Sequence, residues 1–171
     1  MISIFNRSYY EEVLVVRVHP KFLDAQNLMP YKKLSELWKR RYEEIRNFEQ
    51  ALIDNGTSVV KFYLHLSQEE QRKRLLERLE TPAKHWKFNA GDLQERKLWK
   101  EYEEAFEDAL SATSTKQAPW YIIPADDKWY ARAAVADLIS YHLDSLELEY
   151  PTVSQDELAK YAGYIAELQK E

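Results

Sequence analysis

Helical and extended patterns alternate along the first part of the chain. Between residues 34 and 52 apolar residues recur at helical spacing, which predicts an amphipathic helix, and Asn55-Gly56 supplies its end. The next segment, Val59 to Leu66, reads VVKFYLHL and predicts a buried strand because it is rich in β-forming residues. The helical positions are Leu34, Trp38, Ile45, Phe48 and Leu52.

Two shorter segments also have the composition of strands. Ile2 to Phe5 is a β-forming run that leads into Asn-Arg-Ser, and Trp120 to Ile123 lies between two prolines. Strands separated by helices are typical of a parallel sheet covered by helices. We therefore expect Ile2–Phe5 and Val59–Leu64 to be neighbouring parallel strands, with Trp120–Ile123 extending the same sheet.

Local signals divide the helices that follow the second strand. Ser67 and Glu70 form an S-x-x-E capping box, and Thr81-Pro82 predicts the end of that helix. A second long helix is expected after Gly91. Asp126 is a candidate cap for a helix that runs to about residue 146, and Ser154 with Glu157 repeats the capping signature for a terminal helix.

Composition limits the classes of protein that this sequence can encode. Hydrophobic residues make up 45% and charged residues 31% of 171 residues, as in a globular domain. No apolar run approaches the roughly 20 residues that cross a bilayer, so no membrane partner is expected. The chain has no cysteine, which excludes disulfides, thiolate catalysis and cysteine-based zinc sites. A cytoplasmic location is the natural expectation.

Basic residues are concentrated in one part of an acidic chain. Nine basic and four acidic residues lie between Arg72 and Lys100, a net charge of +5, although the whole chain carries −5. This asymmetry favours a local polyanion site over general nucleic-acid binding, so no nucleic-acid partner is expected. The alternative is a solvated helix face whose charges pair at i,i+4, and spacing alone does not separate the two.

The glycines exclude the commonest nucleotide-binding loops. A phosphate loop requires G-x-x-x-x-G-K-[ST], because glycine lets backbone N–H groups close around phosphate oxygens. Glycine occurs only at positions 56, 91 and 163, and no such spacing exists among these residues.

Several segments nevertheless stand in the order found in one family of kinases. The first is Ile2-Ser3-Ile4-Phe5-Asn6-Arg7-Ser8-Tyr9-Tyr10-Glu11, which resembles the Walker-B strand of family 2 polyphosphate kinases. The next segments are Val60-Lys61-Phe62, Leu64-His65-Leu66-Ser67 and Glu69-Glu70-Gln71, followed by Arg74, Arg78, Pro82, Lys84, Trp86, Lys87 and Asp92, and finally by Ala118-Pro119-Trp120, Asp126, Lys128 and Arg132. The pairing of Asn6 with Glu11 resembles the subgroup that phosphorylates both AMP and ADP.

The resemblance implies two groups of site residues. Asn6, Arg7 and Glu11 would be the catalytic residues beside the nucleotide phosphates, with no metal ligand assigned among them. The polyphosphate- and nucleotide-binding residues would be Arg74, Arg78, Lys84, Lys87 and Arg132. Arg74 and Arg78 are four positions apart and therefore share one helix face, where guanidinium groups suit phosphate oxygens. The alternative for the segment around Trp86 is a core anchor surrounded by surface cations.

The resemblance also implies a fold and a function. The fold would be an α/β three-layer P-loop kinase-like parallel sheet with a helical lid, lacking the first strands and the phosphate loop. Residues 1–150 would form this partial domain and residues 151–171 a helical tail. The function would be phosphoryl transfer from inorganic polyphosphate to AMP or ADP with Mg²⁺, impaired in this fragment, by a homo-oligomer. The alternatives are a non-catalytic remnant that binds polyanions or partners, and an ATP-dependent nucleoside monophosphate kinase.

Overall fold

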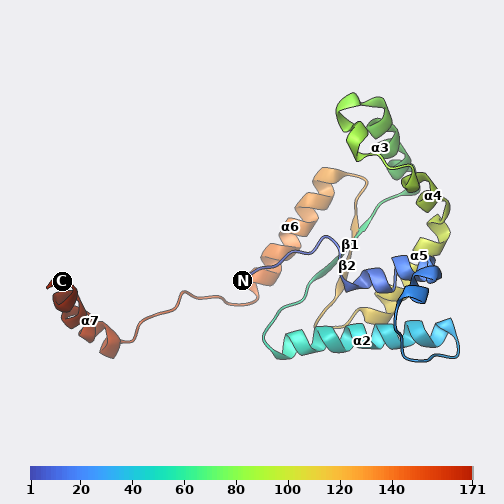
Figure 1. Cartoon of the computed structure of the whole chain (residues 1–171). Coiled ribbons are helices and arrows are strands. Elements are labelled where there is room, and N and C mark those ends of the chain that lie inside the picture. The colour runs from blue at the N-terminus through green and yellow to red at the C-terminus, as the bar shows by residue number, and fades with distance from the viewer. Residues whose placement is uncertain (171) are drawn as a thin grey trace. The chain divides into compact units, whose positions relative to one another are not determined.

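A computed structural model describes residues 1–170 and divides into two compact units, one of residues 1–132 and one that begins at Ala133. Each unit is considered by itself. None of the helices in the described residues is both long and apolar enough to span a membrane. The elements, labelled in Figure 1, are η1 (Tyr9–Glu12), α1 (Val15–Val18), η2 (Pro20–Ala25), α2 (Leu34–Asp54), β1 (Lys61–His65), α3 (Gln68–Glu80), η3 (Pro82–Lys87), α4 (Gly91–Lys97), α5 (Trp99–Thr113), β2 (Trp120–Pro124), α6 (Lys128–Asp144) and α7 (Gln155–Leu168).

The sheet of the first unit has two strands that run parallel. Lys61 of β1 lies opposite Trp120 of β2, and the register continues to His65 opposite Pro124. The chain between them forms α3, η3, α4 and α5, as a parallel pair requires a long crossover. The predicted α/β class with a parallel sheet is therefore confirmed, and helices make up most of the fold.

The strand predicted at Ile2–Phe5 is wrong. Residues 1–5 have no regular secondary structure, and Ile2, Ile4 and Phe5 are exposed. A β-forming sequence becomes a strand only when its backbone hydrogen bonds with a neighbouring strand. Among the described residues β1 and β2 pair with each other alone, so residues 2–5 have no such neighbour.

The core of this unit lies between the N-terminal helices, α2 and α5, which run side by side in Figure 1. The helix predicted for residues 34–52 is confirmed as α2, and its buried face carries Leu37, Trp38, Tyr42 and Ile45. Alanines of α5 complete the core, because their small side chains let the helices approach closely. The N-terminal segment is thereby fixed against the helices that precede and follow β1.

Two capping predictions have different outcomes. The Ser67 hydroxyl accepts the backbone N–H of Glu70 at 3.1 Å, which confirms the predicted start of α3. The cap of α6 was predicted one residue too early: the Asp127 carboxylate accepts the N–H groups of Trp129 and Tyr130. The carboxylate of Asp126 instead accepts the backbone N–H of Ser67 at 2.7 Å, which joins the segments that follow the two strands.

The helix expected after Gly91 is two helices, α4 and α5, with a break at Leu98. The preceding break at Thr81-Pro82 is confirmed, because α3 ends at Glu80 and η3 begins at Pro82. After these interruptions α4 contacts the start of α3 through Arg96, beside the candidate site.

Candidate functional site

A groove of about 510 Å³ lies beside the carboxyl end of β1. Parallel α/β sheets commonly bind ligands outside the carboxyl ends of their strands, and the groove lies at such an end. Its wall combines apolar and aromatic side chains with three arginines and three acids. The lining residues are Tyr63, Leu64, Leu66, Gln71, Arg74, Leu75, Arg78, Asp92, Glu95, Arg96, Trp99, Tyr102, Glu103 and Phe106.

Arg74 and Arg78 of α3 both line this groove, as their spacing predicted. Arg74 is held from two sides: Nε lies 2.8 Å from Glu70 Oε1, and Nη2 donates to the carbonyls of Ala125 and Asp126 at 2.9 and 3.0 Å. Arg78 is less restrained, since its nearest acidic contact is Asp92 at 3.5 Å. Arg74 is therefore pre-oriented, whereas Arg78 is able to turn toward an anion.

Arg96 of α4 is a groove residue that the sequence argument did not single out. Its Nη1 donates to the Gln68 carbonyl at 2.7 Å and to Gln71 Oε1 at 2.9 Å, which joins α4 to the start of α3. Its guanidinium also lies over the Trp99 ring. Arg96 belongs to the basic window, the segment from Arg72 to Lys100, but sequence alone did not show that α4 turns this residue toward α3.

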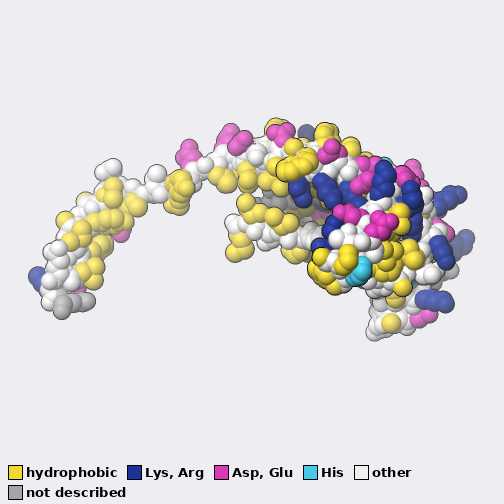
Figure 2. Space-filling view, turned by 90° about the horizontal axis from the view of Figure 1, so that it is seen from above, with side chains coloured by type: hydrophobic (Ala, Val, Ile, Leu, Met, Phe, Trp, Pro, Cys, Tyr) yellow, Lys and Arg dark blue, Asp and Glu magenta, His cyan; other side chains and the backbone are white. Residues whose placement is uncertain are grey.

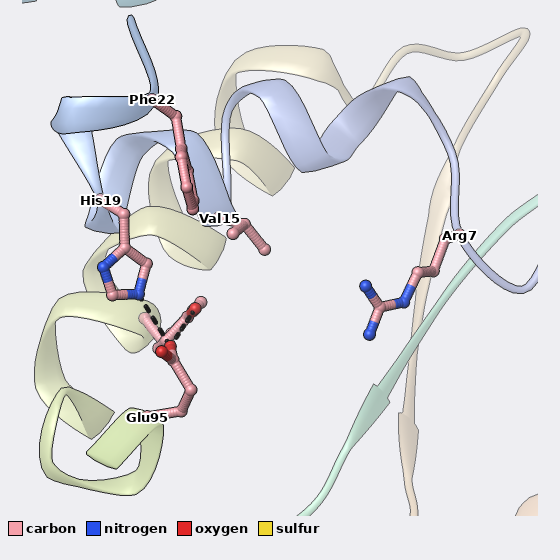
Figure 3. A pocket seen from close by; sticks show the side chains of 6 residues that line it. Arg7, Val15, His19, Phe22 and Glu95 are labelled. Atoms are coloured by element: carbon pink, nitrogen blue, oxygen red, sulfur yellow. Dashed lines mark hydrogen bonds and ion pairs between the residues drawn. The ribbon is translucent and has the colours of Figure 1, made fainter. Parts of the chain in front are cut away.

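A second pocket of about 380 Å³ adjoins the groove through two shared residues, Glu95 and Tyr102. Its other walls are Val15, Phe22, His19 and Arg7. Figure 3 shows Arg7 extending from the N-terminal segment, across the pocket from His19 and Glu95. The pocket therefore has an apolar side formed by the N-terminal helices and opposite charges on facing walls.

One carboxylate oxygen of Glu95 receives two hydrogen-bonding groups. Oε2 lies 2.8 Å from His19 Nε2 and accepts the Tyr102 hydroxyl at 2.7 Å. The bond to His19, and next that to Tyr102, lowers the pKa of the Glu95 carboxyl below its usual value. Burial, followed by the bond to Glu95, raises the pKa of the Tyr102 hydroxyl. The network keeps Glu95 ionised and connects the N-terminal segment with α4 and α5.

The remaining predicted residues lie outside the walls of the groove and the pocket. Lys84 pairs with Glu77 of α3, and the ammonium of Lys87 lies 5.0 Å from the Trp86 ring centroid. Trp86 is 79% exposed, so its alternative role as a core anchor is wrong. Among the other predicted residues, the Arg132 guanidinium lies over the Trp129 ring, Asn6 is exposed, and Glu11 lies 3.9 Å from Arg7.

Some cations of the basic window pair with acids on exposed helix faces, and others line the groove. Arg72 pairs with Glu69, and Lys100 pairs with Glu104 on an exposed surface, as expected for a solvated helix face. Figure 2 shows basic and acidic side chains intermixed on this face of the molecule. Arg74, Arg78 and Arg96 instead line the groove, so these three are the cations of the window that face it.

A buried polar network anchors the N-terminal segment behind these sites. Lys61 Nζ lies 2.6 Å from Glu49 Oε2 and donates to the Tyr10 hydroxyl at 3.1 Å and the Thr113 carbonyl at 3.0 Å. Glu49 Oε1 accepts the hydroxyls of Tyr10 and Tyr9 at 2.8 and 2.9 Å. Burial lowers the pKa of Lys61, and its bond to Glu49 opposes that shift. The single lysine within VVKFYLHL gave no sign of this role.

The metal-binding side chains of the described residues are dispersed. In residues 1–170 no three histidine, aspartate or glutamate side chains gather in a metal-binding arrangement. Asn6 offers one amide oxygen, and the carboxylate of Glu11 faces Arg7. A site built from three such protein ligands is thus not present among the described residues, whereas Mg²⁺ usually binds through one or two carboxylates together with substrate phosphates.

Comparisons with known proteins agree on one family. The polyphosphate kinase 2 family model matches residues 1–151. An ADP-polyphosphate phosphotransferase of Rhodopseudomonas palustris is 51% identical over 151 residues, which cover 88% of this chain and 52% of that protein. An AMP/ADP-polyphosphate phosphotransferase of Meiothermus ruber is 49% identical over 150 residues, which cover 88% of this chain and 52% of that protein.

A solved structure is also similar to this chain. The crystal structure of polyphosphate kinase 2 from Arthrobacter aurescens TC1 matches 97% of this chain with a TM-score of 0.82 and 42% sequence identity. The match covers 55% of that structure's chain. The present chain therefore spans about half the length of the relatives that it matches.

Proposed function

The chain belongs to the polyphosphate kinase 2 family, and we propose that it forms the polyphosphate-binding part of an enzyme that phosphorylates AMP or ADP. The observation that carries this proposal is the groove at the carboxyl end of β1, lined by Arg74, Arg78 and Arg96. The similar proteins of Rhodopseudomonas palustris and Meiothermus ruber are named as phosphotransferases for the same donor and acceptors, which supports the proposal.

The charges of the groove suit an inorganic polyphosphate chain. Each internal phosphate carries about one negative charge, so a bound segment requires several cations along its length rather than one. Guanidinium groups donate two parallel hydrogen bonds to phosphate oxygens. Arg74 and Arg96 are held by their own protein contacts and lose little freedom on binding, whereas Arg78 exchanges its long contact with Asp92 for a phosphate. We propose that Lys84 and Lys87 of η3 contact the outer part of the same chain.

We propose that the phosphate end of the acceptor nucleotide binds in the adjoining pocket. An oxygen of the acceptor's terminal phosphate attacks the terminal phosphorus of polyphosphate, a new P–O bond forms, and the bond to the penultimate phosphate breaks. Arg7 on the pocket wall would neutralise charge on the transferred group, with Asn6 and Glu11 beside it. Arg132 is proposed to contact the nucleotide from the start of α6.

Magnesium would neutralise phosphate charge in this reaction, as in other phosphoryl transfers. The described residues contain no cluster of three metal-binding side chains, and we derive no step through the ion. We also propose a three-layer P-loop kinase-like arrangement for the enzyme, with α3, η3 and α4 as its lid. The phosphate loop is not among the 171 residues. These substrates favour the cytoplasm as the place of reaction.

The proposal is tested by polyphosphate binding to two double variants of equal charge. R74A/R78A removes two cations from the groove, and K97A/K100A removes two from the same basic window outside it. Titration calorimetry at low salt should show at least a tenfold loss of affinity for the first and less than a threefold loss for the second. The wild-type affinity should fall steeply with added salt, since exposed charges are screened over about 8–10 Å.

Equal losses for the two double variants would assign binding to the general surface charge and overturn the groove. Because Arg74 also bonds the backbone after β2, R78A alone serves as the check on folding. R78A should keep the melting temperature of the wild type and still bind more weakly than K100A. Tighter binding of ATP than of polyphosphate would favour the ATP-dependent kinase instead.

A further inference from the structure

The pocket that adjoins the groove carries opposite charges on facing walls. Arg7 extends from the N-terminal segment, and Glu95 of α4 lies across the pocket from it (Figure 3). The Glu95 side chain is 48% exposed, so a ligand in the pocket is able to reach it. A phosphate is attracted to the Arg7 wall and repelled from the Glu95 wall. The Glu95 wall therefore requires a ligand group that is uncharged and donates hydrogen bonds.

Within residues 1–170, the hydrogen bonds of the Glu95 carboxylate are made by one of its two oxygens. The bonds with His19 and with Tyr102 both involve Oε2. They fix the orientation of the carboxylate, and they lower the pKa of the Glu95 carboxyl, so the group is ionised at neutral pH. The other oxygen, Oε1, is available to accept hydrogen bonds from a ligand. An ionised acceptor forms stronger hydrogen bonds with hydroxyl groups than a neutral one does.

Given the proposed function of this pocket, on which the inference rests, we propose that Glu95 binds the ribose hydroxyls of the acceptor nucleotide through Oε1 while Arg7 binds its phosphate. The 2′- and 3′-hydroxyls are neighbouring donors on one side of the sugar, so a single carboxylate is able to accept both. Acidic side chains bind a ribose hydroxyl in this way in dinucleotide-binding folds. Glu95 would then select ribonucleotides over their deoxy forms.

The position of Glu95 favours the ribose over the nucleobase. Glu95 and Tyr102 line both the pocket and the groove, so they lie where the acceptor would meet the polyphosphate. Burial and the bond to Glu95 raise the pKa of the Tyr102 hydroxyl, and the charge of Arg7 on the same pocket opposes this rise. In a nucleoside monophosphate the sugar is bonded directly to the phosphate, whereas the base lies at the far end. The group between the phosphate and the Glu95 wall is therefore the sugar.

The apolar side of the pocket suits the carbon atoms of a sugar. Val15 and Phe22 lie on this side, and the Phe22 ring lies 5.9 Å from the His19 ring, centroid to centroid. Carbon atoms of a ribose that pack here leave its hydroxyls to the polar wall. The pocket volume of about 380 Å³ lies within the range of small-ligand sites, which is about 300–1,000 Å³.

Titration calorimetry on the full chain, with AMP and with 2′,3′-dideoxy-AMP, measures the contribution of the hydroxyls. The wild type should bind AMP at least tenfold more tightly, as expected for hydrogen bonds to a charged acceptor. E95A should bind the two nucleotides with affinities within twofold of each other. If E95A does not fold, E95Q keeps an amide oxygen for His19 and Tyr102 and should still reduce the preference at least threefold. The matched control is E101Q on the exposed surface of α5, which should keep the wild-type preference.

R7A tests the phosphate contact of the proposed function separately, because it should weaken AMP and dideoxy-AMP equally and leave adenosine unchanged. If R7A does so but the wild type binds AMP and dideoxy-AMP alike, the proposed pocket stands and the role of Glu95 is overturned. That role is also overturned if E95A keeps the preference, or if E95A instead removes a preference for AMP over IMP, which would assign Glu95 to the base. A wild-type chain that binds neither AMP nor ADP overturns the proposed pocket, and the role of Glu95 with it.

Discussion

The buried ion pair between Lys61 and Glu49 provides the sharpest test of how the N-terminal segment is held. Lys61 is 7% and Glu49 1% exposed, and the pair lies among Tyr10, Thr113 and Trp120. The substitution K61M keeps an unbranched side chain of similar length but leaves the Glu49 carboxylate without its cation. Removing one partner of a buried pair typically costs about 3–5 kcal/mol.

A second substitution should recover much of this loss. In E49Q/K61M both charges are gone, and the amide oxygen of the glutamine introduced at position 49 still accepts the hydroxyls of Tyr9 and Tyr10 in place of the carboxylate. Replacing a buried ion pair by neutral groups is often close to neutral in stability. We therefore expect the double variant to be more stable than K61M by roughly 2 kcal/mol or more, an interaction of the size seen between contacting residues.

Urea unfolding followed by tryptophan fluorescence measures these differences, because Lys61 lies 5.4 Å from the Trp120 ring centroid. The control is K100M, which removes a cation that is 84% exposed and should change the free energy of unfolding by less than about 0.5 kcal/mol. If K61M does not fold, the double variant should still fold. The reasoning would be refuted if K61M lowered the free energy of unfolding by less than about 1 kcal/mol, or if the double variant were less stable than K61M.

Four further substitutions test single local features. The pKa of Glu95 is lowered in the folded protein, so the stabilisation from its carboxylate is complete above the usual pKa of 4.5 and is lost as the pH falls through the lower folded-state pKa. The difference in melting temperature between wild type and E95Q should therefore shrink below pH 4.5. A difference that stays constant with pH would contradict this. S67A removes the cap of α3 and should cost about 1 kcal/mol in urea unfolding, whereas no loss would mean that the cap is replaced by water. G56A forces a side chain onto a backbone with φ of +80° and should lower the free energy of unfolding by about 1 kcal/mol. G163A instead adds its methyl group in open space within α7 and should raise the helix content. Destabilisation by both substitutions would show that backbone conformation does not distinguish the two glycines.

Local sequence was sufficient for features that neighbouring residues decide. The apolar period of α2, the caps of α3 and α7 and the break at Pro82 depend on contacts within a few residues, and all are present. The strands β1 and β2 also follow from their composition. The family was evident from the order of its motifs, which the matching relatives confirm.

Tertiary structure decided which charged residues share a site. The helical spacing of Arg74 and Arg78 placed them together, but Arg96 joins them only because α4 turns back toward α3 after η3. In the same way His19 meets Glu95 across 76 residues of sequence, a contact that no local pattern encodes.

Two segments that contain β-forming residues show why local sequence does not decide strand formation. Ile2–Phe5 and Lys61–His65 both contain β-forming residues, yet only the second pairs with a neighbouring strand. Lys61 is an ordinary polar residue of its strand until folding surrounds it with Glu49, Tyr10 and Thr113. Propensity belongs to the residue, but strand pairing and the burial of a charge depend on partners that are distant in the sequence.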